Sequence, residues 1–181
     1  MKILDRLPYS INPAPPVALR GQSIRVKAHQ IIVWVSISVA DASEWDARTP
    51  AFPVILDTGN NFTFSIFPSQ LIQWAGVQPQ LLRELGRIRE GGKVYTRHEA
   101  DVWIHPNAPG HRDRRADREP LRLRLARGVA VYPDTASPSH LPLLGLQALT
   151  ENNLHLTIDG QRRLVGLRTA DWRTTLVRWL S

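Results

Sequence analysis

The chain of 181 residues contains no cysteine, which excludes disulfide bonds, thiol nucleophiles and thiolate metal ligands. Long apolar runs are missing as well, since none approaches the roughly eighteen residues of a membrane-spanning helix. The N-terminal segment 1–6 lacks the apolar core that signal peptides carry. We therefore expect a protein that does not enter a membrane and that works in the cytoplasm.

The motifs of metal-dependent and nucleotide-dependent enzymes are missing too. The six histidines include no His-Glu-x-x-His pattern, and the spacing of His105, His111 and Asp113 matches no standard zinc site. No Gly-x-Ser-x-Gly motif and no phosphate-binding glycine loop occur. The sequence predicts neither a bound metal nor a cofactor.

Lysine is scarce, since only three of the 23 basic Lys and Arg residues are lysines and the other 20 are arginines. The formal net charge of +7 would attract nucleic acid or another anionic partner. No nucleic-acid-binding motif accompanies this charge. We interpret it as an arginine-rich solvated surface and keep nucleic-acid binding as the less favoured alternative.

The length fits a single domain with a substantial core, and the hydrophobic content of 43% is ordinary. Four prolines at positions 8 to 16 predict an irregular N-terminal arm over residues 1–23. Residues 24–169 then form the domain, and the arginine-rich polar stretch 106–120 is a loop insertion within it. Residues 170–181 follow as a C-terminal tail.

Alternation of apolar and polar residues predicts strands along most of this domain. The clearest segments are 31–39, 51–57, 62–66, 100–104, 121–125 and 129–132. The pair Gly91 and Gly92 predicts a tight hairpin turn between two further strands. Helical spacing predicts short helices near 68–76 and 146–151, and it is also compatible with a helical turn at 80–85 and with the tail at 170–181. The fold class we expect is all-β, a small antiparallel closed barrel with one or two short helices.

The apolar strand 53–56 runs directly into Asp57, Thr58 and Gly59. A carboxylate that follows a buried strand must be hydrogen-bonded, paired or chemically used, because burying its isolated charge is very costly. Thr58 places a hydroxyl beside it, and Gly59 allows a turn that other residues resist. On its own, this pattern is equally compatible with a tight turn that has no chemical role.

A second pattern follows at residues 141–149, where apolar residues lead into Gly145 and a short helix-like stretch. An alternating strand and an Asp-Gly turn come next, at residues 154–160. In this order, and together with the motif at residues 57–59, these segments resemble the retropepsin-like aspartic proteases, the single-lobed relatives of retroviral protease. The resemblance covers about residues 30–169. It implies a barrel of the acid-protease kind that hydrolyses a peptide or protein substrate.

The resemblance also implies a role for each matching residue. The catalytic residue would be Asp57, and three residues would support its loop, namely Thr58, Gly59 and Gly145. Substrate contacts would come from the end of the loop and from a hairpin that closes over the substrate as a flap. The residues concerned are Asn60, Asn61, Gly91 and Gly92.

Two carboxylates that share one proton can act as general base and general acid, because like charges a few ångströms apart cannot both ionise. This chain has a single Asp-Thr-Gly motif, since the similar segment at 134–136 lacks the glycine. The resemblance therefore implies a homodimer in which each chain contributes one Asp57.

Three positions depart from the family. Asn60 replaces the usual Ala or Ser, Asn61 replaces an Asp that holds substrate backbone in the viral enzymes, and Leu146 replaces an Arg. These changes bear on substrate preference more than on the fold. They leave open an alternative function, that of a catalytically inactive peptide-binding or scaffold domain of the same fold.

Overall fold

The computed structural model describes residues 1–42, 44–133, 135–136 and 138–170. The expected tail at 170–181 lies outside these residues except for its first position, and so does Asp134. Strands account for 46% of the structure and helices for 10%, so the expected mainly β architecture with short helices is confirmed. Among the described residues, every helix is too short or too polar to span a lipid bilayer.

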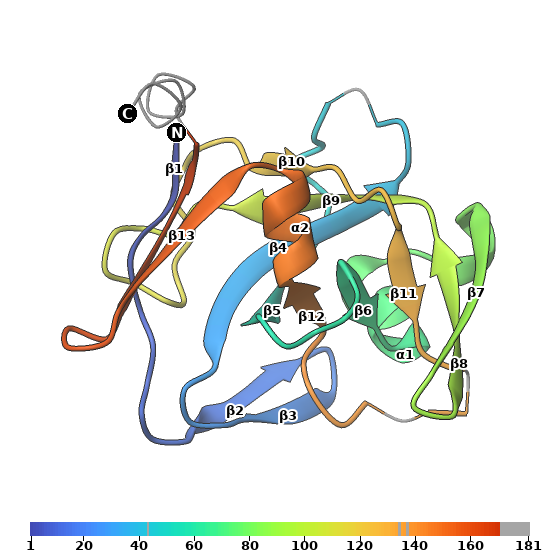
Figure 1. Cartoon of the computed structure of the whole chain (residues 1–181), viewed down its shortest axis with the longest axis horizontal. Coiled ribbons are helices and arrows are strands. Elements are labelled where there is room, and N and C mark those ends of the chain that lie inside the picture. Colours follow the sequence, from blue (N-terminus) through green and yellow to red (C-terminus); the bar gives the residue numbers. More distant parts are fainter. Residues whose placement is uncertain (43, 134, 137, 171–181) are drawn as a thin grey trace, which may run out of the picture.

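Nine strands form the main sheet, in the order β10-β9-β4-β5-β12-β6-β11-β8-β7. Their bounds are Leu121–Leu123 (β10), Ala100–His105 (β9), Ile31–Val39 (β4), Ala51–Asp57 (β5), Leu143–Gly145 (β12), Phe64–Ile66 (β6), Val129–Val131 (β11), Lys93–His98 (β8) and Glu84–Glu90 (β7). Figure 1 shows β5 and β12 near the centre of the molecule, with β7 and β8 at one side. The central strand β5 is apolar up to Asp57, and all five residues before Asp57 are buried.

This sheet is mixed rather than purely antiparallel, which corrects our expectation. β12 runs parallel to β5 and antiparallel to β6, and β11 runs parallel to β6. In sequence, several other strands separate β5 from β12 and β6 from β11, and such a crossover can place a strand parallel to an earlier one. The sheet order ends at β10 and at β7, and no pairing in the described part of the chain joins these two strands. The closed barrel is therefore not confirmed.

Two smaller sheets complete the fold. A three-stranded sheet has the order β1-β14-β13, and a two-stranded sheet is the β2–β3 hairpin, seen at the bottom of Figure 1. The bounds are Lys2–Pro8 (β1), Ala14–Leu19 (β2), Gln22–Val26 (β3), Leu154–Asp159 (β13) and Leu164–Thr169 (β14). Buried residues of β1, β3 and β14 join those of the main sheet in one hydrophobic core.

The N-terminal arm is therefore not irregular, and our prediction from its prolines was wrong. Pro8 is the last residue of β1, which is an edge strand of the β1-β14-β13 sheet. Pro15 and Pro16 lie within a register shift between Ala14 and Val17 in the two-stranded sheet. Proline is tolerated at edge strands and irregularities of this kind, because the strand there needs fewer N–H donors.

The helical segments near 68–76 and 146–151 lie where the sequence predicted them, whereas the turn expected at 80–85 lies at Pro79–Leu81 and β7 already begins at Glu84. Their bounds are Pro68–Gln70 (α1), Leu71–Ala75 (η1, a π-type turn), Pro79–Leu81 (η2, a 3-10 turn) and Leu146–Glu151 (α2). Trp74 of η1 is fully buried, and its ring lies 6.3 Å from that of Phe52 in β5. The segment after β6 therefore packs against the strand that ends at Asp57.

Residues 106–120 connect β9 to β10 as the expected loop. Asn107 is buried at its start and fastens it to β1. Its Oδ1 accepts the N–H of Asp5 at 2.8 Å, and its Nδ2 donates to the carbonyl of Asp5 at 3.1 Å. The arginines of this loop are thus carried on a main chain that one buried amide holds in place.

Candidate functional site

Asp57 is the last residue of β5 and lies where this buried strand reaches the surface. Its side chain is partly buried, whereas Thr58 and Gly59 are exposed. The N–H of Asn60 closes the turn by donating to the carbonyl of Asp57 at 3.3 Å. The carboxylate thus stands at the boundary between the core and the solvent. The segment 57–63 is called the Asp57 loop below.

The main chain of this loop orients the Asp57 carboxylate. The N–H of Gly59 donates to Oδ1 at 2.9 Å. A Cβ on residue 59 would lie 3.4 Å from the same oxygen, which is an ordinary van der Waals distance, so the main-chain N–H rather than the missing side chain makes this contact. The Asp-Thr-Gly pattern therefore has a local structural meaning, because its third residue holds the side chain of its first.

β12 lies directly beside the end of β5. Gly145 is the register partner of Asp57 in this parallel pair, and its N–H donates to the carbonyl of Thr63 at 2.9 Å. A Cβ on residue 145 would come closer than 3.0 Å to the carbonyl oxygen of Phe62, which real Cβ atoms essentially never do. Only glycine fits at this crossing without movement of the loop. The structure thus brings Asp57 and Gly145 together.

Asn60 is directed into the framework of the loop. Its Nδ2 donates to Ser65 Oγ at 3.4 Å and to the carbonyl of Leu143 at 3.5 Å. Its Oδ1 accepts the N–H of Phe62 at 3.3 Å. These contacts tie the loop to β6 and β12. A contact between Asn60 and a substrate, which the sequence led us to expect, would compete with them.

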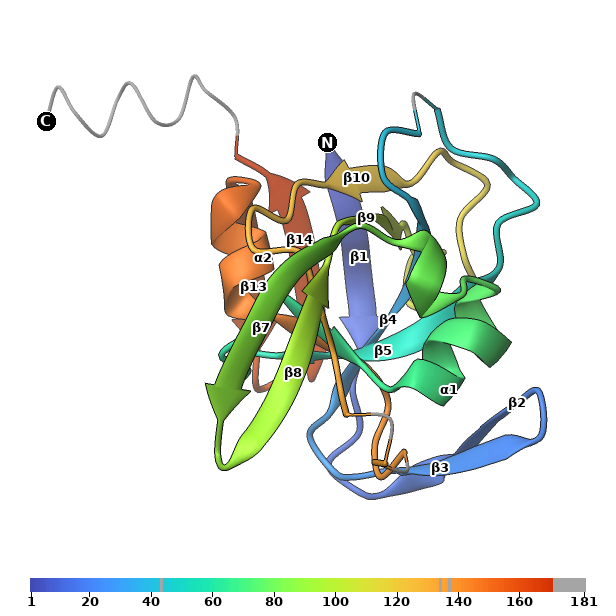
Figure 2. The same cartoon turned by 90° about the vertical axis from the view of Figure 1, so that its right-hand side faces the viewer.

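Gly91 and Gly92 form the turn of the β7–β8 hairpin, as the sequence predicted. Their φ angles are +54° and +76°, and positive φ at both positions is what a two-residue type I′ turn requires. Figure 2 shows the hairpin as a long curved ribbon whose turn points away from β10. The side-chain amide of Asn61 hydrogen-bonds to the carboxylate of Glu90, next to this turn. The hairpin tip is therefore fastened to the Asp57 loop.

A buried contact between Thr63 and Gly128 escaped the sequence analysis. Thr63 Oγ1 donates to the carbonyl of Gly128 at 2.7 Å. Gly128 has a φ of +69°, and a Cβ there would collide with the carbonyl of His98. The glycine itself signals a turn before β11, but nothing local to the sequence identifies its partner. The contact anchors the end of the Asp57 loop to the turn that starts β11.

An aromatic cluster beside the loop was also missed. Tyr132 stacks on Phe67 with ring centroids 4.1 Å apart and meets Tyr95 at 5.1 Å. Tyr95 in turn contacts Phe62 of the Asp57 loop at 4.8 Å. The cluster thus connects β8 and the residues that follow β6 and β11 to the loop. Aromatic residues this far apart in sequence show no periodicity that would reveal their contact.

The hydroxyl of Tyr132 is hydrogen-bonded within this cluster. His140 Nδ1 lies 2.6 Å from the carbonyl of Leu141 and must donate to it, so a neutral His140 accepts the Tyr132 hydroxyl at Nε2, 3.2 Å away. Burial raises the pKa of Tyr132, and the nearby charges of Asp57 and Glu90 add to this shift. The phenol therefore stays protonated at neutral pH.

In the described part of the chain, no three His, Cys, Asp or Glu side chains lie together as metal ligands would. His105, which the sequence analysis weighed as a ligand, is buried in β9. It lies 2.8 Å from Ser36 Oγ and edge-on to the ring of Trp45. Burial lowers the pKa of His105 to about 4, and the charge of Arg115 adds to this effect. The imidazole is therefore neutral at pH 7.

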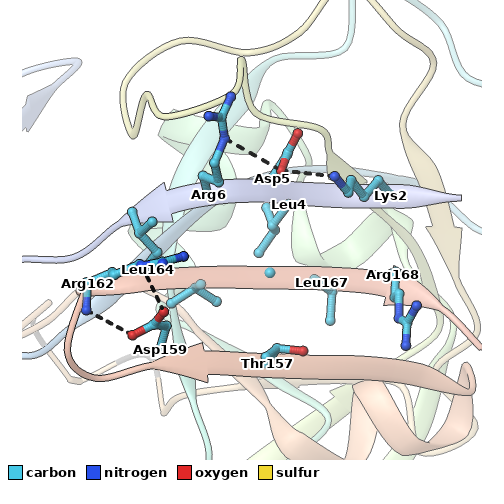
Figure 3. A pocket seen from close by; sticks show the side chains of 12 residues that line it. Lys2, Leu4, Asp5, Arg6, Thr157, Asp159, Arg162, Leu164, Leu167 and Arg168 are labelled. Carbon is cyan, nitrogen blue, oxygen red and sulfur yellow. Dashed lines mark hydrogen bonds and ion pairs between the residues drawn. The ribbon is translucent and has the colours of Figure 1, made fainter.

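Two cavities differ in their relation to this site. One, of about 230 Å³, lies between the Asp57 loop and the hairpin and is lined by Asn61, Ile88 and Arg97 among others. The other, of about 290 Å³, lies on the β1-β14-β13 sheet. Figure 3 shows its basic rim and its acidic residues, Asp5 and Asp159, in ion pairs within the rim. Its lining contains no residue of the Asp57 loop, so only the first cavity belongs to the site.

Comparison of the chain with protein-family models, with curated proteins and with solved structures found no match.

Proposed function

We propose that this chain is an aspartic endopeptidase of the retropepsin-like kind. The observation that carries the proposal is the register between β5 and β12, which sets Gly145 beside Asp57. The two segments that suggested the family are 88 positions apart in sequence, yet they are adjacent strands. A solvent-accessible Asp-Thr-Gly turn supported in this way has the form that a carboxylate needs to act on a water molecule.

The proposal includes the closed barrel of that family and a twofold homodimer. One core shared by residues of all three sheets supports a compact, wrapped arrangement. A dimer is required because a single Asp57 cannot be base and acid at once, and no second carboxylate in the described residues is hydrogen-bonded to it. Thr58 and Gly59 are exposed, so a second copy can approach the loop along a twofold axis.

In this mechanism, one Asp57 takes a proton from the attacking water, while the protonated Asp57 of the second chain polarises the peptide carbonyl. The N–H of Gly59 keeps the carboxylate oriented through Oδ1. The β7–β8 hairpin covers an extended peptide, and the contact between Asn61 and Glu90 holds its tip in the closed position. The substrate is a peptide or protein.

The alternative is a peptide-binding or scaffold domain of the same fold that does not cleave. The side chain of Asn60 favours this alternative, because its contacts with Ser65 and Leu143 brace the loop without serving chemistry. Such a domain would still hold an extended peptide between the loop and the hairpin. Cleavage separates the two functions.

The test compares Asp57→Asn with wild type and with Asp117→Asn, a matched change in the exposed arginine-rich loop. A broad peptide library is incubated with each protein from about pH 3 to 8 and profiled by mass spectrometry. We expect wild type and Asp117→Asn to cleave, and Asp57→Asn to fold and dimerise without cleaving. Cleavage that persists in Asp57→Asn would refute the assignment. Binding without cleavage by all three proteins would establish the scaffold function instead.

A further inference from the structure

The cavity between the Asp57 loop and the hairpin has an unusual chemical character. Its volume of about 230 Å³ suits one side chain rather than a whole ligand. Phe62 and Ile88 supply apolar walls from the loop and from β7, and Arg97 of β8 and Arg127 supply two guanidinium groups. Its lining starts four positions after Asp57, at Asn61.

Both guanidinium groups lack a counter-charge. Arg97 Nε is buried and has no hydrogen-bond partner. Among the residues that the structure describes, no carboxylate forms an ion pair with Arg97 or Arg127. Glu90, the acidic residue at the hairpin tip, accepts a hydrogen bond from Asn61 instead. A buried N–H donor without an acceptor is destabilising, so an acceptor from outside the chain would complete the site.

The hairpin places these groups on one face. Ile88 and Tyr95 are cross-strand partners, and Arg97 follows Tyr95 by two positions in β8, so all three lie on the same side of the ribbon. Tyr95 contacts Phe62 at 4.8 Å, which shows that this side faces the Asp57 loop. A peptide held between the loop and the hairpin would therefore present a side chain to Arg97.

We propose that this cavity is a specificity subsite that binds an acidic side chain, Asp or Glu, of the substrate. The inference rests on the proposed peptide-binding function and adds its substrate class. A carboxylate matches the planar guanidinium group, which can donate two parallel hydrogen bonds to it. The methylene stem of the same side chain packs between Phe62 and Ile88. Arg97 is the inner, partly buried anion ligand, and Arg127 is the outer, exposed one.

The test measures binding on the Asp57→Asn background, so that the result does not depend on cleavage. Amidated ten-residue peptides with one Glu moved along a neutral frame are titrated against the protein and compared with the matched Gln peptides. We expect the Glu peptide to bind at least about tenfold more tightly than the Gln peptide at one position of the frame. The added change Arg97→Gln should reduce this ratio to about one without weakening the Gln peptide.

Two further variants make the result specific. Arg127→Gln alters an exposed residue, so it keeps the test possible if the Arg97→Gln protein does not fold. We expect it to fold and to lower the ratio of Glu-peptide to Gln-peptide affinity. Arg168→Gln, at an exposed arginine on β14, should leave the ratio unchanged. A ratio in the Arg97→Gln and Arg127→Gln proteins that equals the ratio of the parent Asp57→Asn protein overturns the inference. The Gln peptide is also titrated with a free C-terminal carboxylate, and tighter binding of this peptide without any preference for Glu overturns the side-chain assignment.

Failure of this inference can be told apart from failure of the proposed function. Peptides that bind, or that wild type cleaves, with no preference for Glu contradict the acidic subsite alone. Absence of binding to every peptide, together with absence of cleavage by wild type, contradicts both proposals.

Discussion

Replacement of Gly145 by alanine tests the close crossing of β12 and the Asp57 loop. The added Cβ would lie closer than 3.0 Å to the Phe62 carbonyl oxygen and 3.1 Å from that of Asn60. Both obstacles are main-chain atoms, so no side-chain rotation relieves them. The strand and the loop must separate, and this movement lengthens the 2.9 Å hydrogen bond from the Gly145 N–H to Thr63.

The expected loss of stability has two parts. Forcing an extra methyl group into a packed site costs about 1–3 kcal/mol. The weakened hydrogen bond adds about 1 kcal/mol. The free energy of unfolding should therefore fall by about 2–4 kcal/mol, which for a protein of this size lowers the Tm by roughly 4–16 °C.

Denaturant unfolding followed by circular dichroism measures this loss, with Gly160→Ala as the control. A Cβ on residue 160 would meet no atom within 4 Å, and the turn there does not need a positive φ. We expect the control to unfold within about 0.5 kcal/mol of wild type. Equal unfolding midpoints for Gly145→Ala and Gly160→Ala would refute the described crossing. If Asp57 acts as proposed, the Gly145→Ala protein should also lose peptidase activity before it unfolds.

Further predictions concern buried polar groups. Thr63→Val should lower the free energy of unfolding by about 1–3 kcal/mol, because it leaves the Gly128 carbonyl without its hydroxyl donor, and denaturant unfolding checks this. Spectrophotometric titration should show Tyr95 and Tyr132 ionising above pH 10, since burial raises the pKa of both; normal titration of both would contradict their burial. Stability should decrease from about pH 6.5 to about pH 4, because the unfolded chain protonates His105 in this range while the native state resists it. A flat profile in this range, or one unaltered in His105→Gln, would contradict that origin.

Features set by local chemistry could be predicted from the sequence. The Gly91–Gly92 turn follows from the need for positive φ at both central residues of a two-residue hairpin turn. The apolar run of β5 and the turn at residues 57–59 follow from composition over a few neighbouring positions. Both helical segments begin at positions that propensity and spacing identify, which is why their locations were correct.

Features set by pairing partners could not be predicted. The parallel registers of β12 and β11 depend on which strand, distant in sequence, each one meets, and alternation in sequence carries no record of that choice. The prolines of the arm gave a misleading signal because strand edges tolerate them. The contact between Asn61 and Glu90 and the buried Nε of Arg97 arise where distant segments meet, so their residues looked like ordinary surface positions.

The proposed activity and the stability of the fold depend on pH in opposite directions. A pair of carboxylates that shares a proton works on the acidic side, since activity is lost once both are ionised. His105 acts in the other direction, because its pKa of about 4 in the native state against about 6.5 in the unfolded chain removes up to about 3 kcal/mol of stability as the pH falls between these values. We predict that this loss makes unfolding, rather than the chemical step, the acidic limit of activity. In His105→Gln, whose amide can still hydrogen-bond to Ser36, that limit should move to lower pH while the alkaline limit stays in place. If both limits move together, or if neither moves, unfolding at His105 does not control the acidic limit.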